Sequence, residues 1–153
     1  LIRRVPNLID AFMAQGQPIH VLVHSQGSMI WNKGIALWKE QWIERAHVRT
    51  LKSRYLLRFD AEALLKRWVV LETCGNAVSS WTPGPVYLHW VHPRDPAVLL
   101  LGTHQPKKTS DGVFVILQGD TRTGTQAHDM HHYARHRARV LKGQSVRQFV
   151  MYR

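Results

Sequence analysis

Three residues of this chain have side chains that could together perform nucleophilic catalysis, and each is flanked by residues typical of a loop. They are Ser25 in Val23-His24-Ser25-Gln26-Gly27, Asp95 in His92-Pro93-Arg94-Asp95-Pro96, and His128 in Ala127-His128-Asp129-Met130. A serine hydroxyl becomes an effective nucleophile when a histidine takes its proton and a carboxylate orients the imidazole and stabilises its charge. These residue types predict acyl transfer with Ser25 as nucleophile, His128 as base and Asp95 as acid.

The residues around Ser25 indicate the tight strand-to-helix turn that such a nucleophile needs. The pattern G-x-S-x-G places small residues on both sides of the serine. Gly27 occupies the second small position here, whereas Val23 stands in place of the first glycine. The backbone N–H of Gln26 would donate to the developing oxyanion, helped by the N-terminus of the following helix. Taken alone, the motifs leave simpler roles open: Ser25 as a helix cap and Asp95-Pro96 as a turn opener.

The elements that must position these residues alternate between helical and strand-like patterns. Residues 1–15 and 29–42 have apolar residues at helical spacing, Asp60 suggests the N-cap of a helix over 61–66, and 126–141 is also predicted to be helical. Strands are expected at 19–24, 68–73, 86–91 and 113–117, with a short helical turn or loop at 96–101. The basic segment 45–58 is predicted to be a helix end and a connection, and 79–85, 105–112 and 119–125 are predicted to be turns or loops.

This alternation predicts an α/β fold with a mainly parallel sheet and flanking helices. In such sheets the chemistry lies at the carboxyl ends of the strands. Ser25, Asp95 and His128 all follow expected strands, in that order along the chain. The predicted topology therefore brings all three to the same edge of the sheet.

The motifs together resemble those of the α/β-hydrolase superfamily, in particular bacterial lipase-like and esterase-like serine hydrolases. His24-Ser25-Gln26-Gly27-Ser28 is similar to the G-H-S-x-G elbow of that family. The segment Trp90–Val98 with Leu101-Gly102 resembles the family's Asp-Pro-Val-type segment, whose aspartate is the triad acid. His128-Asp129-Met130 followed by Tyr133 resembles its H-x-x-x-x-Y segment, whose histidine is the base. The resemblance covers roughly residues 18–136.

The resemblance implies a lipase-type or esterase-type enzyme that cleaves a small-molecule or lipid ester without a cofactor. Full members have several strands before the elbow, and a loop after an early strand normally supplies a second oxyanion donor. Only about one helix precedes Ser25 here, and the first residue is Leu1. We therefore expect residues 1–153 to form a single, incomplete α/β-hydrolase-like domain that lacks its N-terminal strands, with a basic tail at 142–153. Another chain or a longer parent protein would supply the missing part.

The charge balance supports two other interpretations. Lys and Arg number 21 against 10 Asp and Glu, a formal charge of +11, with concentrations at 45–58 and 135–153. Such an excess attracts the phosphates of nucleic acids or of anionic lipid surfaces. A basic nucleic-acid-binding module is the main non-enzyme alternative, but no known binding motif favours it. The other alternative is a truncated or inactive hydrolase-fold protein.

The cysteine and histidine patterns do not favour a metal site. Cys74 is the only cysteine, which excludes an intramolecular disulfide and a CxxC pair. His128, His132 and His136 could line one face of a helix, but no acidic or thiol ligand joins them at a recognised zinc spacing. A single cysteine suits a reducing compartment, and neither a signal peptide nor a membrane-spanning stretch is visible. The sequence thus predicts a cytoplasmic protein without a metal.

Overall fold

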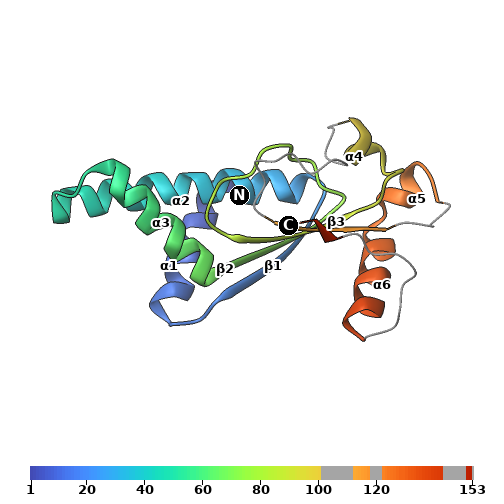
Figure 1. Cartoon of the computed structure of the whole chain (residues 1–153), viewed down its shortest axis with the longest axis horizontal. Coiled ribbons are helices and arrows are strands. Elements are labelled where there is room, and N and C mark those ends of the chain that lie inside the picture. Colours follow the sequence, from blue (N-terminus) through green and yellow to red (C-terminus); the bar gives the residue numbers. More distant parts are fainter. Residues whose placement is uncertain (101–111, 118–121, 143–150, 153) are drawn as a thin grey trace.

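The computed structural model has one sheet whose four main strands are parallel (Figure 1). It describes residues 1–100, 112–117, 122–142, 151 and 152. The strands β1 (Ile19–His24), β2 (Val69–Cys74), β3 (Val86–Val91) and β4 (Val113–Ile116) follow one another across the sheet in chain order. A short strand, β5 (Met151–Tyr152), pairs antiparallel with β4. The carboxyl ends of β1 to β4 therefore lie along one edge.

Helices cover both faces of this sheet. A short 3₁₀ helix (Ile2–Arg4), α1 (Val5–Ala14), the long α2 (Gln26–Thr50) and α3 (Arg54–Trp68) come from the first half of the chain. The second half supplies α4 (Pro96–Leu100), α5 (Thr125–His128) and α6 (Met130–Leu141). In Figure 1, α2 and α6 lie on opposite sides of the sheet. None of the helices in the described ranges is long and apolar enough to cross a membrane.

Two apolar clusters follow from the alternation of side chains along the strands. On one face, Ile19, Val23, Val69 and Leu71 pack against α1, α2 and α3, with Trp38 of α2 fully buried among them. On the other face, Cys74, Trp90 and Val115 pack against Tyr133 of α6. Burial of the Cys74 thiol raises its pKa to about 12. The second cluster fixes α6 directly beside the strand ends that carry the candidate site.

A buried carboxylate also attaches α6 to the sheet. Glu72 of β2 is 1% exposed and accepts hydrogen bonds from His20 of β1 (2.8 Å), Trp90 of β3 (2.7 Å) and Arg137 of α6 (2.5 Å). Burial alone would raise the pKa of Glu72, but the hydrogen bonds from Arg137, Trp90 and His20 outweigh it and lower the pKa. One ionised side chain thus joins three strands to α6.

The structure confirms the α/β class and the mainly parallel sheet with flanking helices, and it corrects several element boundaries. The segment 45–58, expected to contain a helix end and a connection, has both, since α2 ends at Thr50, but α3 already begins at Arg54 and not at residue 61. Asp60 is not an N-cap but lies inside α3, because the cap is Ser53, whose hydroxyl accepts from the Leu56 N–H at 3.4 Å. The connection between the two helices is therefore shorter than expected, residues 51–53.

The helix expected over 126–141 is divided into α5 and α6. Asp129 adopts an extended backbone conformation and caps α6 by accepting from the His131 N–H at 3.0 Å. His128 therefore ends one helix, while His132 and His136 lie on the next. The strand β5 was not expected from the sequence. Of the predicted loops and the basic tail, residues 105–111, 119–121, 143–150 and 153 lie outside the described residues, and residue 125 begins α5.

We predict that Glu72→Gln lowers the free energy of unfolding at neutral pH by about 1–3 kcal/mol, because Arg137 loses its charged acceptor in a buried position. Since the pKa of Glu72 is depressed in the fold, its stabilisation is complete above the ordinary pKa of 4.5 and is lost as pH falls through the folded value. Urea unfolding across a pH series should therefore show parent and variant converging in acid. Glu40→Gln, at an exposed position of α2, should show no such difference.

Candidate active site

Ser25 lies at the sharp turn between β1 and α2, in a backbone conformation that is rare for a side-chain-bearing residue. Its φ and ψ angles are 49° and −120°. It occupies the N-cap position of α2, yet its side chain makes no capping hydrogen bond. Its N–H donates to the carbonyl oxygen of Cys74 at the end of β2, at 3.0 Å. Non-glycine residues with positive φ concentrate at functional sites, and the geometry excludes capping as the role of the hydroxyl.

Hydrogen bonds of Ser28, a residue that the sequence did not indicate as functional, stabilise the turn. Ser28 is fully buried, and its hydroxyl donates to the Ser25 carbonyl oxygen at 2.5 Å while accepting from the Ala77 N–H at 3.2 Å. A Cβ built on Gly27 would lie 3.4 Å from the Cβ of Val23. That is an ordinary contact distance, so the valine that stands in place of the resembled motif's first glycine fits beside residue 27.

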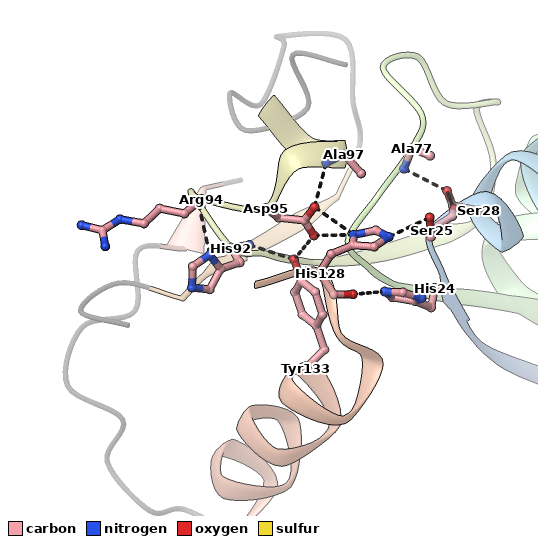
Figure 2. A network of polar contacts seen from close by, with 10 residues as sticks. All are labelled: His24, Ser25, Ser28, Ala77, His92, Arg94, Asp95, Ala97, His128 and Tyr133. Atoms are coloured by element: carbon pink, nitrogen blue, oxygen red, sulfur yellow. Dashed lines mark hydrogen bonds and ion pairs between the residues drawn. The ribbon is translucent and has the colours of Figure 1, made fainter. Parts of the chain in front are cut away.

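The structure brings Ser25, His128 and Asp95 together in one hydrogen-bonded series (Figure 2). The Nε2 of His128 lies 3.0 Å from the Ser25 hydroxyl oxygen. The Nδ1 of His128 lies 2.8 and 2.9 Å from the two carboxylate oxygens of Asp95. Because the carboxylate can only accept, Nδ1 carries the proton and Nε2 is left as the acceptor of the serine proton. This is the tautomer that a general base needs.

Asp95 is fully buried and has partners from three parts of the chain. Besides His128, it accepts from the Ala97 N–H at the start of α4 (2.8 Å) and from the Tyr133 hydroxyl of α6 (2.8 Å). The Tyr133 hydroxyl also accepts from the His92 N–H at 3.2 Å. Burial, and then the nearby negative charge of Asp95, raise the pKa of Tyr133 far above its ordinary value. Tyr133 therefore stays protonated and remains a donor to the carboxylate.

His128 is held by its backbone as well as by its ring. The Nε2–H of His24 donates to the carbonyl oxygen of His128 at 2.6 Å, and the two ring centroids are 4.6 Å apart. Desolvation by burial lowers the pKa of His24, which favours its neutral form. His24 precedes Ser25 directly, so this contact ties the base to the turn that carries the nucleophile.

Gly75 allows the close approach of Asp95 and His128. It follows β2 with a φ of +55°, and a Cβ built on it would lie 2.9 Å from Oδ2 of Asp95 and 3.0 Å from Nδ1 of His128. A side chain there would enter the space that the acid–base pair occupies. The sequence showed only a glycine at a strand end, and its contact with the pair depends on β3 and α5, which are distant along the chain.

The backbone N–H of Gln26, expected to be an oxyanion donor, lies at the N-terminus of α2, in the residue directly after Ser25. Gln26 is the first residue of α2, and the first N–H groups of a helix have no carbonyl partner within it. The positive end of the helix dipole reinforces a donor at this position. The side chain of Gln26 is exposed, so the position offers its backbone N–H rather than its amide group.

The remaining histidines do not form a metal site within the described ranges, where no group of three candidate ligands was found. His132 and His136 stack edge to face on α6, with ring centroids 4.6 Å apart. His128 contacts Ser25 and Asp95 and does not join His132 and His136. His89 is buried beside Thr73, and burial lowers its pKa to about 3. The histidine face considered as a zinc site is therefore divided between two helices.

A hollow of about 810 Å³ lies away from the triad. Its lining includes Lys39, Glu44, Arg54, Arg58, Glu62 and Thr82, from α2, α3 and the segment before β3. None of Ser25, Asp95 and His128 lines it. Its many charged groups also differ from the apolar surface that an acyl chain would need. This hollow is therefore not assigned to the reaction.

We predict that Gly75→Ala slows covalent modification of Ser25 by about 10²–10⁴-fold, because the new methyl group displaces the Asp95–His128 pair from its working geometry. The measurement is the rate of fluorophosphonate labelling of the folded chain. Gly16→Ala is the matched control: Gly16 also has a positive φ, of +66°, but nothing lies within 4 Å of its Cβ position. A Gly75→Ala variant that is labelled as fast as Gly16→Ala would contradict the role assigned to the close approach at Gly75.

We predict that Tyr133→Phe lowers the free energy of unfolding by about 1–3 kcal/mol, because it leaves a buried carboxylate and the His92 N–H each without one partner. Equilibrium urea unfolding measures the change. Tyr55→Phe removes the same hydroxyl from a residue that is 68% exposed and should leave stability unchanged. A Tyr133→Phe variant with the same free energy of unfolding as the parent would contradict the role of this hydroxyl in holding Asp95.

Comparisons with known proteins add no relationship to this geometry. No protein-family model matches the chain. The search of curated proteins and the search of solved structures also found no significant match. The functional interpretation therefore depends on the arrangement of Ser25, His128, Asp95 and the groups that hold them.

Proposed function

We propose that this chain is a serine hydrolase of lipase or esterase type, which cleaves an ester through Ser25, His128 and Asp95. The observation that carries the proposal is the unbroken hydrogen-bonded series from the Ser25 hydroxyl through both ring nitrogens of His128 to the buried carboxylate of Asp95. Three residues separated by 70 and 33 positions in the sequence meet at hydrogen-bonding distances. That combination of order and geometry is the arrangement by which such triads are recognised.

In the first half of the reaction, the Ser25 oxygen attacks the ester carbonyl carbon while Nε2 of His128 takes the hydroxyl proton. The N–H of Gln26 donates to the oxyanion of the tetrahedral intermediate. When the intermediate collapses, the bond to the alcohol breaks, and His128 returns the proton to the leaving oxygen. In the second half, water repeats these steps on the acyl-serine and releases the acid. Asp95 stabilises the imidazolium each time it forms.

The arrangement of strands supports the α/β-hydrolase assignment that the motifs suggest. The nucleophile follows β1, the acid follows β3 and the base follows β4, all at the carboxyl edge of a parallel sheet. The helix after the nucleophile and the order Ser, Asp, His agree with that family. β1 has one strand neighbour, β2, in the described part of the sheet. We therefore propose an incomplete hydrolase fold, in which further strands are expected beside β1.

We predict that a fluorophosphonate labels Ser25 of the purified chain, because His128 activates the hydroxyl. Mass spectrometry of the labelled peptide identifies the site. Ser25→Ala should abolish labelling, and His128→Ala should slow it by about 10³-fold or more. Ser79→Ala and His131→Ala change exposed residues of the same types and should label at the parent rate. Hydrolysis of short-chain and long-chain p-nitrophenyl esters then establishes the acyl preference.

A folded chain that fails to react would contradict the proposed activity of this chain. Circular dichroism and thermal unfolding establish whether each preparation is folded. In that outcome the interpretation becomes a hydrolase-fold protein without activity, for which a second oxyanion donor is a specific missing element. Loss of one such donor costs about 10²–10³ in rate.

A further inference from the structure

The end of the α2–α3 hairpin exposes large apolar side chains far along α2 from the catalytic turn. We call residues 48–59 the hairpin tip: they comprise the last turn of α2, the connection and the first turns of α3. Five of its side chains are apolar and each more than half exposed, namely Val48, Leu51, Tyr55, Leu56 and Phe59. Figure 1 shows this hairpin projecting beyond the sheet at one end of the molecule. Scattered apolar residues need no explanation, whereas a cluster on a protruding element indicates contact with another phase or molecule.

Leu51, in the connection between the two helices, has two unfavourable features: an exposed apolar side chain and a positive φ angle. It is 86% exposed, and it ends α2 in the left-handed conformation with a φ of 56°. Glycine or asparagine usually occupies this position, because a side chain is disfavoured at positive φ. Its N–H still donates to the His47 carbonyl oxygen at 3.0 Å, which completes the helix end. A leucine therefore projects outward at a position where glycine would form the same turn more easily.

The charge around the tip is positive and only partly neutralised. Residues 44–60 contain five Lys and Arg and two acidic residues, which gives +3 (five minus two). Three of the five cations are in ion pairs: Lys52 with Asp60, Arg54 with Glu44, and Arg45 with Asp10 of α1. Arg49 and Arg58 have no acidic partner recorded among the described residues. The tip thus presents apolar side chains together with cations that remain available for an anion.

We propose that the hairpin tip docks the chain on an anionic lipid surface. Leu51, Leu56 and Phe59 would enter the boundary between head groups and acyl chains, while the arginines contact lipid phosphates. A second copy of the chain fits less well, because two tips of the same positive charge would repel each other. Nucleic acid would satisfy the arginines but would leave the aliphatic side chains in water. This proposal goes beyond the hydrolase assignment and does not rest on it.

The test is co-sedimentation of the full chain with vesicles of phosphatidylcholine mixed with phosphatidylglycerol, compared with vesicles of pure phosphatidylcholine. We expect binding to the anionic vesicles that weakens at high salt. The double variant Leu51→Ser/Phe59→Ser should lower the partition coefficient at least about tenfold, and Arg49→Glu/Arg58→Glu should do the same. Matched controls change exposed residues elsewhere: Leu1→Ser/Leu141→Ser and Arg3→Glu/Arg4→Glu should bind as the parent does.

A probe on residue 51 distinguishes insertion from a general attraction of the positively charged chain. Cys74 is buried, so a Leu51→Cys variant can be labelled at the tip with an environment-sensitive dye, and a Leu1→Cys variant serves as the reference. A blue shift at 51 but not at 1 on adding anionic vesicles supports the proposal. Parent-like vesicle binding by both tip variants, or an unshifted dye, would overturn it. So would tip-dependent dimerisation or polyuridylate binding without vesicle binding.

Discussion

The carboxylate of Asp95 has no exposed surface, and an ionised group in that position must find its hydrogen bonds inside the protein. The fold meets this requirement with donors from α4, from His128 at the end of α5, and from Tyr133 of α6. Each donor lies on a different element, so these elements cannot shift independently. The geometry of the Ser25–His128–Asp95 series and the packing of the C-terminal half are thus two results of one constraint.

The parallel sheet makes this convergence possible, because the segments after β1, β2, β3 and β4 all leave from the same edge. On one face of the sheet, Glu72 binds Arg137 and holds α6. At the carboxyl edge of the sheet, the Cys74 carbonyl oxygen and the Ser28 hydroxyl hold the backbone of Ser25 by hydrogen bonds. The backbone of Ser25 is therefore held by two strands and by the helix that follows it. Such support lets a strained backbone conformation persist in the folded protein.

The sequence allowed prediction of the parts of the structure that local patterns determine. The strands β1 and β3 and the three loops after the strands follow from β-branched runs and from glycine and proline. The start of α3 was not predicted, because the residues that this helix buries, such as Leu57 and Ala61, are few and stand among charged side chains. The break at Asp129 depends on its capping bond, and the role of Gly75 depends on side chains from distant segments. The three residues of the triad could be predicted from the sequence, but the distances between them depend on tertiary contacts and could not.

One helix, α2, begins beside Ser25 and ends at the hairpin tip. Its 25 residues span about 37 Å at 1.5 Å per residue. A negatively charged membrane enriches protons near its surface, but this effect decays within a Debye length of about 8 Å at physiological salt. A chain docked through the tip would hold its triad several Debye lengths from the membrane. Even if α2 were tilted so that this distance was halved, it would remain more than two Debye lengths. The triad would then lie in bulk solution, outside the acidic layer at the lipid.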